Sequence, residues 1–453
     1  MLSLYDAQER ADTLVARARR AGSDAADVVY LANASESVSV RLGRLEDVER
    51  SESEHIGLRV FVGANSAGIG SASIGSSDLS DGALDELAAR AVAMARAAPQ
   101  DPYAGLAPDE LLMRGPAPEL DILDPAEPSP QALRAQAEAA EDAARAVAGV
   151  TNSEGGGASA GRSIMALATS HGFAGAYAAT AHSLSVSVVA GTGSTMQRDY
   201  AWRTARHGED LPAAEDIGEL AGKRAVARVN PTRVKSGPMP IVFDPRVGGT
   251  LIGHLLGAMS GSAIARRASF LLGREDEQLF DSAITLTDHP HRRRGLRSRP
   301  FDGEGLPTAR RNLVENGRIT TWLMDSASAR QLGLAPTGHA ARGGSGAPGV
   351  SATNLHLEPG SLSPAELMAD IVEGIYVTEL IGMGVNGVTG DYSRGASGYR
   401  IVRGEITEAV AEFTVAGNLV DIYAALTPAN DLEWHRALNV PTLRVDGLTV
   451  AGD

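Results

Sequence analysis

Residues 377–399, VTELIGMGVNGVTGDYSRGASGY, organise the second half of this chain. The segment opens as an apolar strand and then becomes rich in glycine. Glycine lets one backbone pass close to another, or to a ligand, where a Cβ would collide. Within the glycine-rich part, residues 389–395 carry a carboxylate, a phenol, a hydroxyl and a guanidinium. We therefore predict that these polar groups share one short loop.

The length of the chain predicts two domains, because 453 residues exceed one ordinary hydrophobic core. The proline-containing segment 231–240 favours a boundary there. We expect residues 1–235 to form an α+β domain with a proline-rich crossing at 99–128. Residues 236–453 should form a β-rich domain with peripheral helices. The fold class is thus α+β.

Composition excludes several kinds of site. Cysteine is absent, which removes disulfides, thiolate nucleophiles and cysteine-containing zinc sites. A net charge of −15 argues against a nucleic-acid-binding surface, which lysine and arginine would have to supply. The chain contains no run of 18 apolar residues, so we expect no membrane span. The N-terminus lacks the layout of a signal peptide. A cytoplasmic location fits best.

The N-terminal half shows the order helix, several strands, helix twice, which favours a structural duplication. Helices are expected at 4–21, 80–98, 129–148 and 212–228. The expected strands are short, at 28–32, 37–42, 56–62, 68–74, 163–169, 175–180, 182–190 and 195–203. In the C-terminal half we expect a strand at 241–245, helices at 246–260, 326–332 and 364–373, a hairpin around 316–317, and a strand at 410–415.

Several motifs resemble chemical signatures without the context that the chemistry needs. Residues 382–387 fit G-x-G-x-x-G, but no helix start follows to receive a pyrophosphate. Residues 157–161 fit the G-x-S-x-G pattern of serine hydrolases, and a hairpin loop is the preferred interpretation. His289 and His291, on either side of a proline, are typical of an exposed turn more often than of a metal site.

Two further segments leave alternatives open. The arginine-rich residues 292–299 favour a solvated loop, with a docking patch for an acidic partner as the alternative. His339 lies in a second glycine-rich loop, 337–350, where close backbone approach makes a role in a pocket credible.

A set of short blocks resembles the TldD/PmbA family, and specifically its PmbA branch, also called TldE. The older label of this family is modulator of DNA gyrase. The resemblance covers most of the chain and is strongest across 236–425. The blocks lie at 248–254, 300–305, 328–334, 337–340, 378–380, 389–395 and 416–419.

The resemblance also implies what has been lost. In the TldD branch a helix carries H-E-x-x-x-H, and a later cysteine completes a zinc site whose water the glutamate activates. Alignment on Gly249 puts Gly253 at the first histidine, His254 at the glutamate and Ala258 at the second histidine. Zinc affinity of roughly 10 kcal/mol or more depends on the whole ligand set, so we expect no zinc site and no catalytic residue here.

The resemblance therefore implies the non-zinc-binding PmbA/TldE-type subunit of a metallopeptidase complex. A TldD-type partner would bring the zinc, and the substrates would be unfolded or modified peptides. In isolation the chain could form a homodimer. His339, Asp391, Tyr392 and Arg394 are the candidates for facing substrate or partner, although Asp391 and Arg394 could instead form an ion pair that fixes the loop. The rival functions are an autonomous hydrolase with an unrecognised site and a regulatory binding protein without a proteolytic partner.

Overall fold

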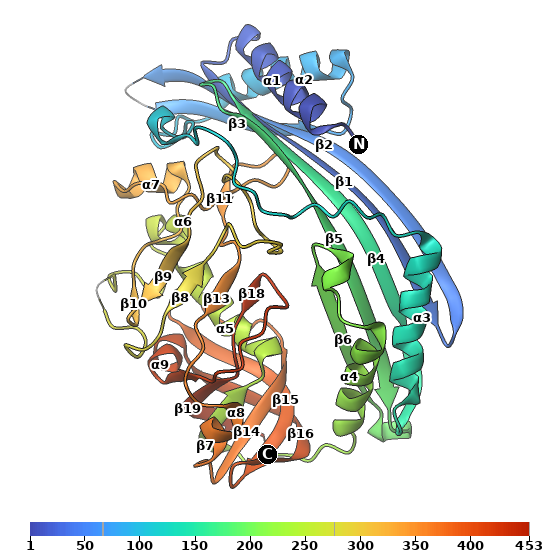
Figure 1. The fold of residues 1–453 in the computed structure, drawn as a ribbon. Helices are drawn as coiled ribbons and strands as arrows, with labels where there is room; N and C mark the ends of the chain where they lie inside the picture. The colour runs from blue at the N-terminus through green and yellow to red at the C-terminus, as the bar shows by residue number, and fades with distance from the viewer. Residues whose placement is uncertain (66–67, 276, 453) are drawn as a thin grey trace.

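A six-stranded antiparallel sheet dominates the N-terminal half of the chain in the computed structural model, which describes residues 1–65, 68–275 and 277–452 (Figure 1). The strand order is β3-β2-β1-β4-β5-β6, so each half of the sheet is an up-and-down run of three strands, and β1 and β4 join the halves. The strands are β1 (Ala25–Arg41), β2 (Arg44–Asn65), β3 (Gly68–Ser76), β4 (Val150–Thr169), β5 (Ala174–Ala190) and β6 (Gln197–Ala205).

Four helices cover one face of this sheet at its two ends. Helices α1 (Leu4–Arg20) and α2 (Asp81–Ala97) pack against one end, and α3 (Pro130–Ala146) and α4 (Ala214–Ala227) against the other (Figure 1). Along β1, Val28 and Tyr30 contact the first helix pair, whereas Val38 and Val40 contact the second. The order helix, three strands, helix occurs twice, which confirms the predicted duplicated arrangement.

The strands are much longer than predicted. The expected strands at 28–32 and 37–42 are parts of the single strand β1, and the G-x-S-x-G segment 157–161 lies inside β4 rather than in a hairpin loop. Just before this segment, α3 approaches β4 so closely that a Cβ on Gly156 would lie 2.5 Å from the carbonyl oxygen of Ala137. Glycine and serine interrupt the apolar pattern, so the lengths of the strands predicted from the sequence were too short.

Five strands of the C-terminal half close into a barrel, because β19 (Leu443–Ala451) pairs with both β7 (Gly237–Phe243) and β16 (Glu405–Asn418). The circuit continues through β15 (Asp391–Val402) and β14 (Glu373–Ile381), which lies parallel to β7. β17 (Leu426–Pro428) pairs antiparallel with β19. Helix α5 (Pro245–Ala258) contributes Leu251, Ile252 and Leu255 to the apolar core that it shares with these strands.

A second, smaller sheet lies beside the barrel (Figure 1). It comprises β10 (Arg318–Ile319), β9 (Arg311–Glu315), β8 (Leu286–Asp288), β13 (Leu355–Leu357) and β18 (Leu438–Asn439), while β11 (Ala340–Ala341) and β12 (Gly349–Val350) form a separate pair. Short helices are α6 (Gly261–Ala265), α7 (Ser326–Leu332), α8 (Pro364–Met368) and α9 (Leu419–Ala424). Helix α8 ends five residues earlier than expected because β14 already begins at Glu373. The boundary at 235/236 stays a prediction.

The segment 292–299 is a loop, as expected, and Arg293 and Arg297 are exposed, but its other arginines are partly buried, and the expected exposed turn at 289–291 is wrong. Arg294 pairs with Asp121 at 2.7 Å and with Glu209 at 2.6 Å, and the Arg292 guanidinium lies 3.3 Å from the ring centre of Trp434. The side chains of the two flanking histidines, His289 and His291, are half-buried. The segment thus connects the N-terminal and C-terminal halves. No helix within the described ranges is long and apolar enough to cross a membrane.

A buried ionic cluster also joins the two halves. Asp27 on β1 accepts hydrogen bonds from Arg59 on β2 and from Arg342, which lies 315 positions further along the chain. All three are less than 9% exposed, and Glu304 lies 3.7 Å from Arg59. Burial alone would raise the pKa of Asp27, but the two guanidinium groups outweigh it and hold that pKa below its usual value.

Asp302, beside this cluster, should make stability fall as the pH rises from about 4 to 7. Burial and the Glu304 carboxylate raise the pKa of Asp302 to about 7. In that window the folded chain keeps a proton that the unfolded chain has released, so rising pH favours unfolding. Between pH 5 and 7 we expect a loss of at least about 1 kcal/mol that Asp302→Asn does not show. Urea denaturation at several pH values measures the free energy of unfolding of both proteins. An equal change of this free energy with pH for the unaltered chain and for Asp302→Asn would contradict the prediction.

Candidate functional site

Helix α5 carries Gly253, His254 and Ala258. The helix begins after Asp244, whose carboxylate accepts a hydrogen bond from the Arg246 backbone N–H at 2.8 Å. Gly253 is exposed, His254 is half-buried and Ala258 is buried. Glycine and alanine side chains have no lone pair, so this donor set does not fit a zinc ion. Within the part of the chain that the structure describes, no group of three His, Cys, Asp or Glu side chains could hold a metal.

His254 faces Tyr392 of the barrel strand β15. The two rings meet edge to face, with centroids 6.2 Å apart and planes at 70°. Tyr392 is 2% exposed, yet neither its hydroxyl nor the buried Nε2 of His254 has a hydrogen-bond partner among the described residues. Burial raises the pKa of Tyr392 to about 12, and burial, followed by the charge of Arg394, lowers the pKa of His254. At neutral pH the phenol is therefore protonated and the imidazole uncharged.

Arg394 projects from the same side of β15 as Tyr392. Residues two apart on a strand share a face, and Tyr392 and Ala396, on either side of Arg394, both belong to the apolar core. The guanidinium donates one hydrogen bond, from Nη2 to the Leu380 carbonyl at 3.4 Å. Its Nε is buried without a partner, and the guanidinium forms no ion pair with any described residue.

Asp391 has a different role. The predicted short loop at 389–395 is wrong, because Asp391 begins β15 and pairs with Asn418 of β16. The carboxylate accepts hydrogen bonds from the Thr389 hydroxyl at 2.6 Å and from the Asn418 amide at 3.3 Å. Asp391 and Arg394 do not form the ion pair that was the alternative interpretation. Asp391 instead holds the end of the loop 382–390 against the neighbouring strand.

His339 makes its contacts with a different set of residues. It is 3% exposed, and its Nε2 lies 3.3 Å from Asp288, while its Nδ1 lies 2.8 Å from the Thr337 hydroxyl. Asp288 also accepts two hydrogen bonds from Thr353, each 2.7 Å long. Of the four candidates from the sequence, the structure brings Tyr392 and Arg394 together on one face.

The sequence did not reveal the open face of α5. A Cβ on Gly253 or on Gly257 would meet nothing within 4 Å, and both positions are exposed. The signal was the spacing of Gly249, Gly253 and Gly257, four residues apart on one helix. Neither did the sequence indicate that His254 and Tyr392 would meet. They are distant in the chain, and only the closure of the barrel against α5 puts them in contact.

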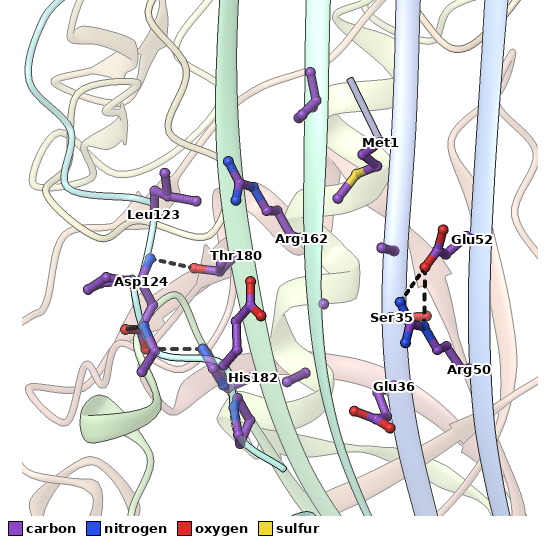
Figure 2. Close-up of a pocket in the computed structure, with 18 of the residues that line it drawn as sticks. Met1, Ser35, Glu36, Arg50, Glu52, Leu123, Asp124, Arg162, Thr180 and His182 are labelled. Atoms are coloured by element: carbon purple, nitrogen blue, oxygen red, sulfur yellow. Dashed lines mark hydrogen bonds and ion pairs between the residues drawn. The ribbon is translucent and has the colours of Figure 1, made fainter. Parts of the chain in front are cut away.

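A second candidate is a cavity of about 820 Å³ on the N-terminal sheet. The N-terminus and the crossing segment 123–128 border it, together with residues from β1, β2, β4 and β5 (Figure 2). His182 and Asp124 point toward each other there, 3.1 Å apart, and Arg50 pairs with Glu52 at 2.6 Å. These four side chains thus have partners within the cavity, and Arg162 and Glu36 line it as well.

Comparison with protein families matches three consecutive segments of the chain. Residues 26–95 match the description "PmbA/TldA metallopeptidase domain 1", and residues 123–229 match the central domain of the same family. Residues 236–452 match "PmbA/TldA metallopeptidase C-terminal domain", which contains α5 and the barrel.

Relatives and solved structures resemble the whole chain. "Metalloprotease PmbA" of Escherichia coli O157:H7 is 37% identical over 95% of this chain and 93% of its own length, and a PmbA homolog of Haemophilus influenzae is 34% identical over 96% and 94%. A crystal structure from Bacteroides thetaiotaomicron, named for modulation of DNA gyrase, superposes with a TM-score of 0.89 at 26% identity and covers 100% of both chains. TldE from Thermococcus kodakarensis shares the fold, with a TM-score of 0.84 at 22% identity, covering 98% of this chain and 100% of TldE.

Proposed function

This chain belongs to the PmbA/TldD metallopeptidase family, and from that premise we propose that it is the non-zinc-binding, PmbA/TldE-type subunit of a metallopeptidase complex. The complex would work in the cytoplasm on unfolded or modified peptides, and a TldD-type partner would supply the zinc.

The observation that carries the proposal is the donor set on α5. Gly253 and Ala258 stand where the family resemblance places two imidazoles, and neither side chain can bind a metal. The helix itself is intact, capped and packed into the core through its apolar side. The loss is therefore confined to the chemical groups, and the scaffold that would present them to a partner is kept.

The test combines this chain with the product of a reading frame from the same genome that contains H-E-x-x-x-H. We expect the mixture to cleave an unfolded peptide at least about tenfold faster than that product alone, a difference of ~1.4 kcal/mol in barrier height. Zinc should co-purify with the partner and not with this chain. The matched control replaces the glutamate of the partner's motif by glutamine, which should abolish cleavage while leaving the complex assembled.

Three outcomes would contradict the proposal. The partner could cleave equally well alone, which removes any need for this subunit. This chain could cleave peptides alone in the presence of a chelator, which would favour an autonomous hydrolase. The two proteins could fail to associate on co-expression, which would favour a binding protein without a proteolytic partner.

A further inference from the structure

Arg394 is a half-buried cation whose charge is not balanced by the part of the chain that the structure describes. Two other partly buried arginines have stronger partners than Arg394. Arg246 is paired with the buried Asp199 at 2.8 Å, and Arg330 donates to three backbone carbonyls at 2.8–3.0 Å. Arg394 has one carbonyl at 3.4 Å and an unpartnered Nε. A partly buried guanidinium with so few partners is poised to accept an anion.

Two more polar groups without partners lie beside it. The Tyr392 hydroxyl belongs to a side chain that is 98% buried, and it has no hydrogen-bond partner among the described residues. The buried Nε2 of His254 is in the same condition and lies across from the Tyr392 ring. A phenol donates one O–H and a neutral imidazole one N–H. The charge of Arg394 acts on both groups, since it lowers the pKa of His254 and opposes the effect of burial on the pKa of Tyr392, so all three polar groups belong to one region.

The surface of α5 beside His254 leaves room for a ligand. Gly253 precedes His254 and Gly257 follows one turn later, and a Cβ at either position would meet no atom within 4 Å. The core residues Ala396 and Tyr392 flank Arg394 on its strand, so part of its surroundings is apolar. Hydrogen bonds to a charged group are stronger in such surroundings than in open water.

We propose that Arg394, Tyr392 and His254 form a binding site for a carboxylate group carried by a peptide. A planar carboxylate matches the fork of a guanidinium and can accept two of its N–H groups, and its remaining lone pairs can accept from the phenol and the imidazole. The choice of a peptide as the carrier rests on the proposed function. The site itself uses residues of this chain alone and needs no metal.

Calorimetric titration of the purified full chain tests the site with three acetylated peptides. The first is trialanine with a free C-terminal carboxylate, the second is the same peptide as its amide, and the third is an amide with glutamate in the middle. We expect the two peptides that carry a carboxylate to bind about tenfold or more tightly than the neutral amide. The preference between the first and third distinguishes a terminal carboxylate from a side-chain carboxylate.

Variants then locate the binding. Arg394→Gln should weaken binding of the carboxylate peptides about tenfold or more, Tyr392→Phe should weaken it about threefold, and Arg394→Lys should retain part of it. The matched control is Arg134→Gln, which removes an exposed guanidinium on helix α3 and should leave binding unchanged. Circular dichroism checks the folding of every variant. If Arg394→Gln does not fold, the comparison of free and amidated peptides on the unaltered chain still decides.

The proposal is overturned if the amide binds as tightly as the free carboxylate, if no peptide binds, or if folded Arg394→Gln binds like the unaltered chain. These failures differ from failure of the subunit proposal, because the titration contains no partner. Peptide binding without any effect on the partner's cleavage would retain the carboxylate site and remove the subunit role. Faster cleavage with no carboxylate preference would do the opposite.

Discussion

Asp27→Asn should lower the free energy of unfolding by about 3–5 kcal/mol, because it leaves two buried guanidinium groups without their shared counter-charge. Asp27 is 2% exposed and accepts hydrogen bonds from Arg59 and Arg342. Asparagine has the same shape, so the packing is kept and only the charge is lost. The remaining carboxylate, Glu304, lies 3.7 Å from Arg59 and cannot replace both contacts.

The matched control lies on the same sheet. Glu52 pairs with Arg50 at 2.6 Å, but both side chains are exposed, so Glu52→Gln should leave stability close to that of the unaltered chain. Urea denaturation followed by circular dichroism measures both variants. Equal midpoints for Asp27→Asn and Glu52→Gln would show that burial of the cluster does not increase the loss of stability when its carboxylate is removed.

Gly398→Ala should destabilise the barrel by about 3 kcal/mol, the upper part of the range for overpacking. A Cβ at this position of β15 would lie 2.0 Å from the carbonyl oxygen of Tyr376 and 2.9 Å from the Cα of Val377 on the neighbouring strand. Both obstacles are backbone atoms, so relief requires the two strands to separate. A local register shift between Val377 and Glu379 lies directly beside this close approach.

Gly395→Ala is the control for this prediction. Gly395 lies three residues earlier on β15. The atom nearest to a Cβ added there would be the Cβ of Ile381 at 3.5 Å, an ordinary contact. Thermal and urea unfolding should place Gly395→Ala near the unaltered chain and Gly398→Ala well below it. If the two variants lose stability equally, then the general strand preference of alanine, rather than the collision, sets the effect.

The sequence predicted the elements of this fold better than their lengths. Proline and cap positions placed α2 and α3 within about two residues, because those signals are local. The long strands were missed because glycine interrupts their apolar pattern, and the reason for a glycine such as Gly156, the close approach of α3, appears only in the assembled sheet. Closure of the barrel through β19 was not predictable either, since pairing between distant strands leaves no local pattern.

At the candidate site, the sequence indicated residue types without their geometry. Tyr392 and Arg394 were identified from a short motif, but the motif was interpreted as one short loop that all four polar groups share. Strand pairing with β16 instead separates Asp391 from Arg394 by placing them on opposite faces. His254 was identified as a lost catalytic position, and its contact with Tyr392 comes from tertiary packing alone.

The position of β19 in the barrel bears on how the polypeptide folds during synthesis. The strand that completes the circuit, Leu443–Ala451, is also the last to be translated among those that form it. A nascent chain on the ribosome therefore holds β7 and β16 with unpaired edges until these residues leave the exit tunnel. The N-terminal sheet contains only residues before 206, so it can fold co-translationally, while the barrel must wait.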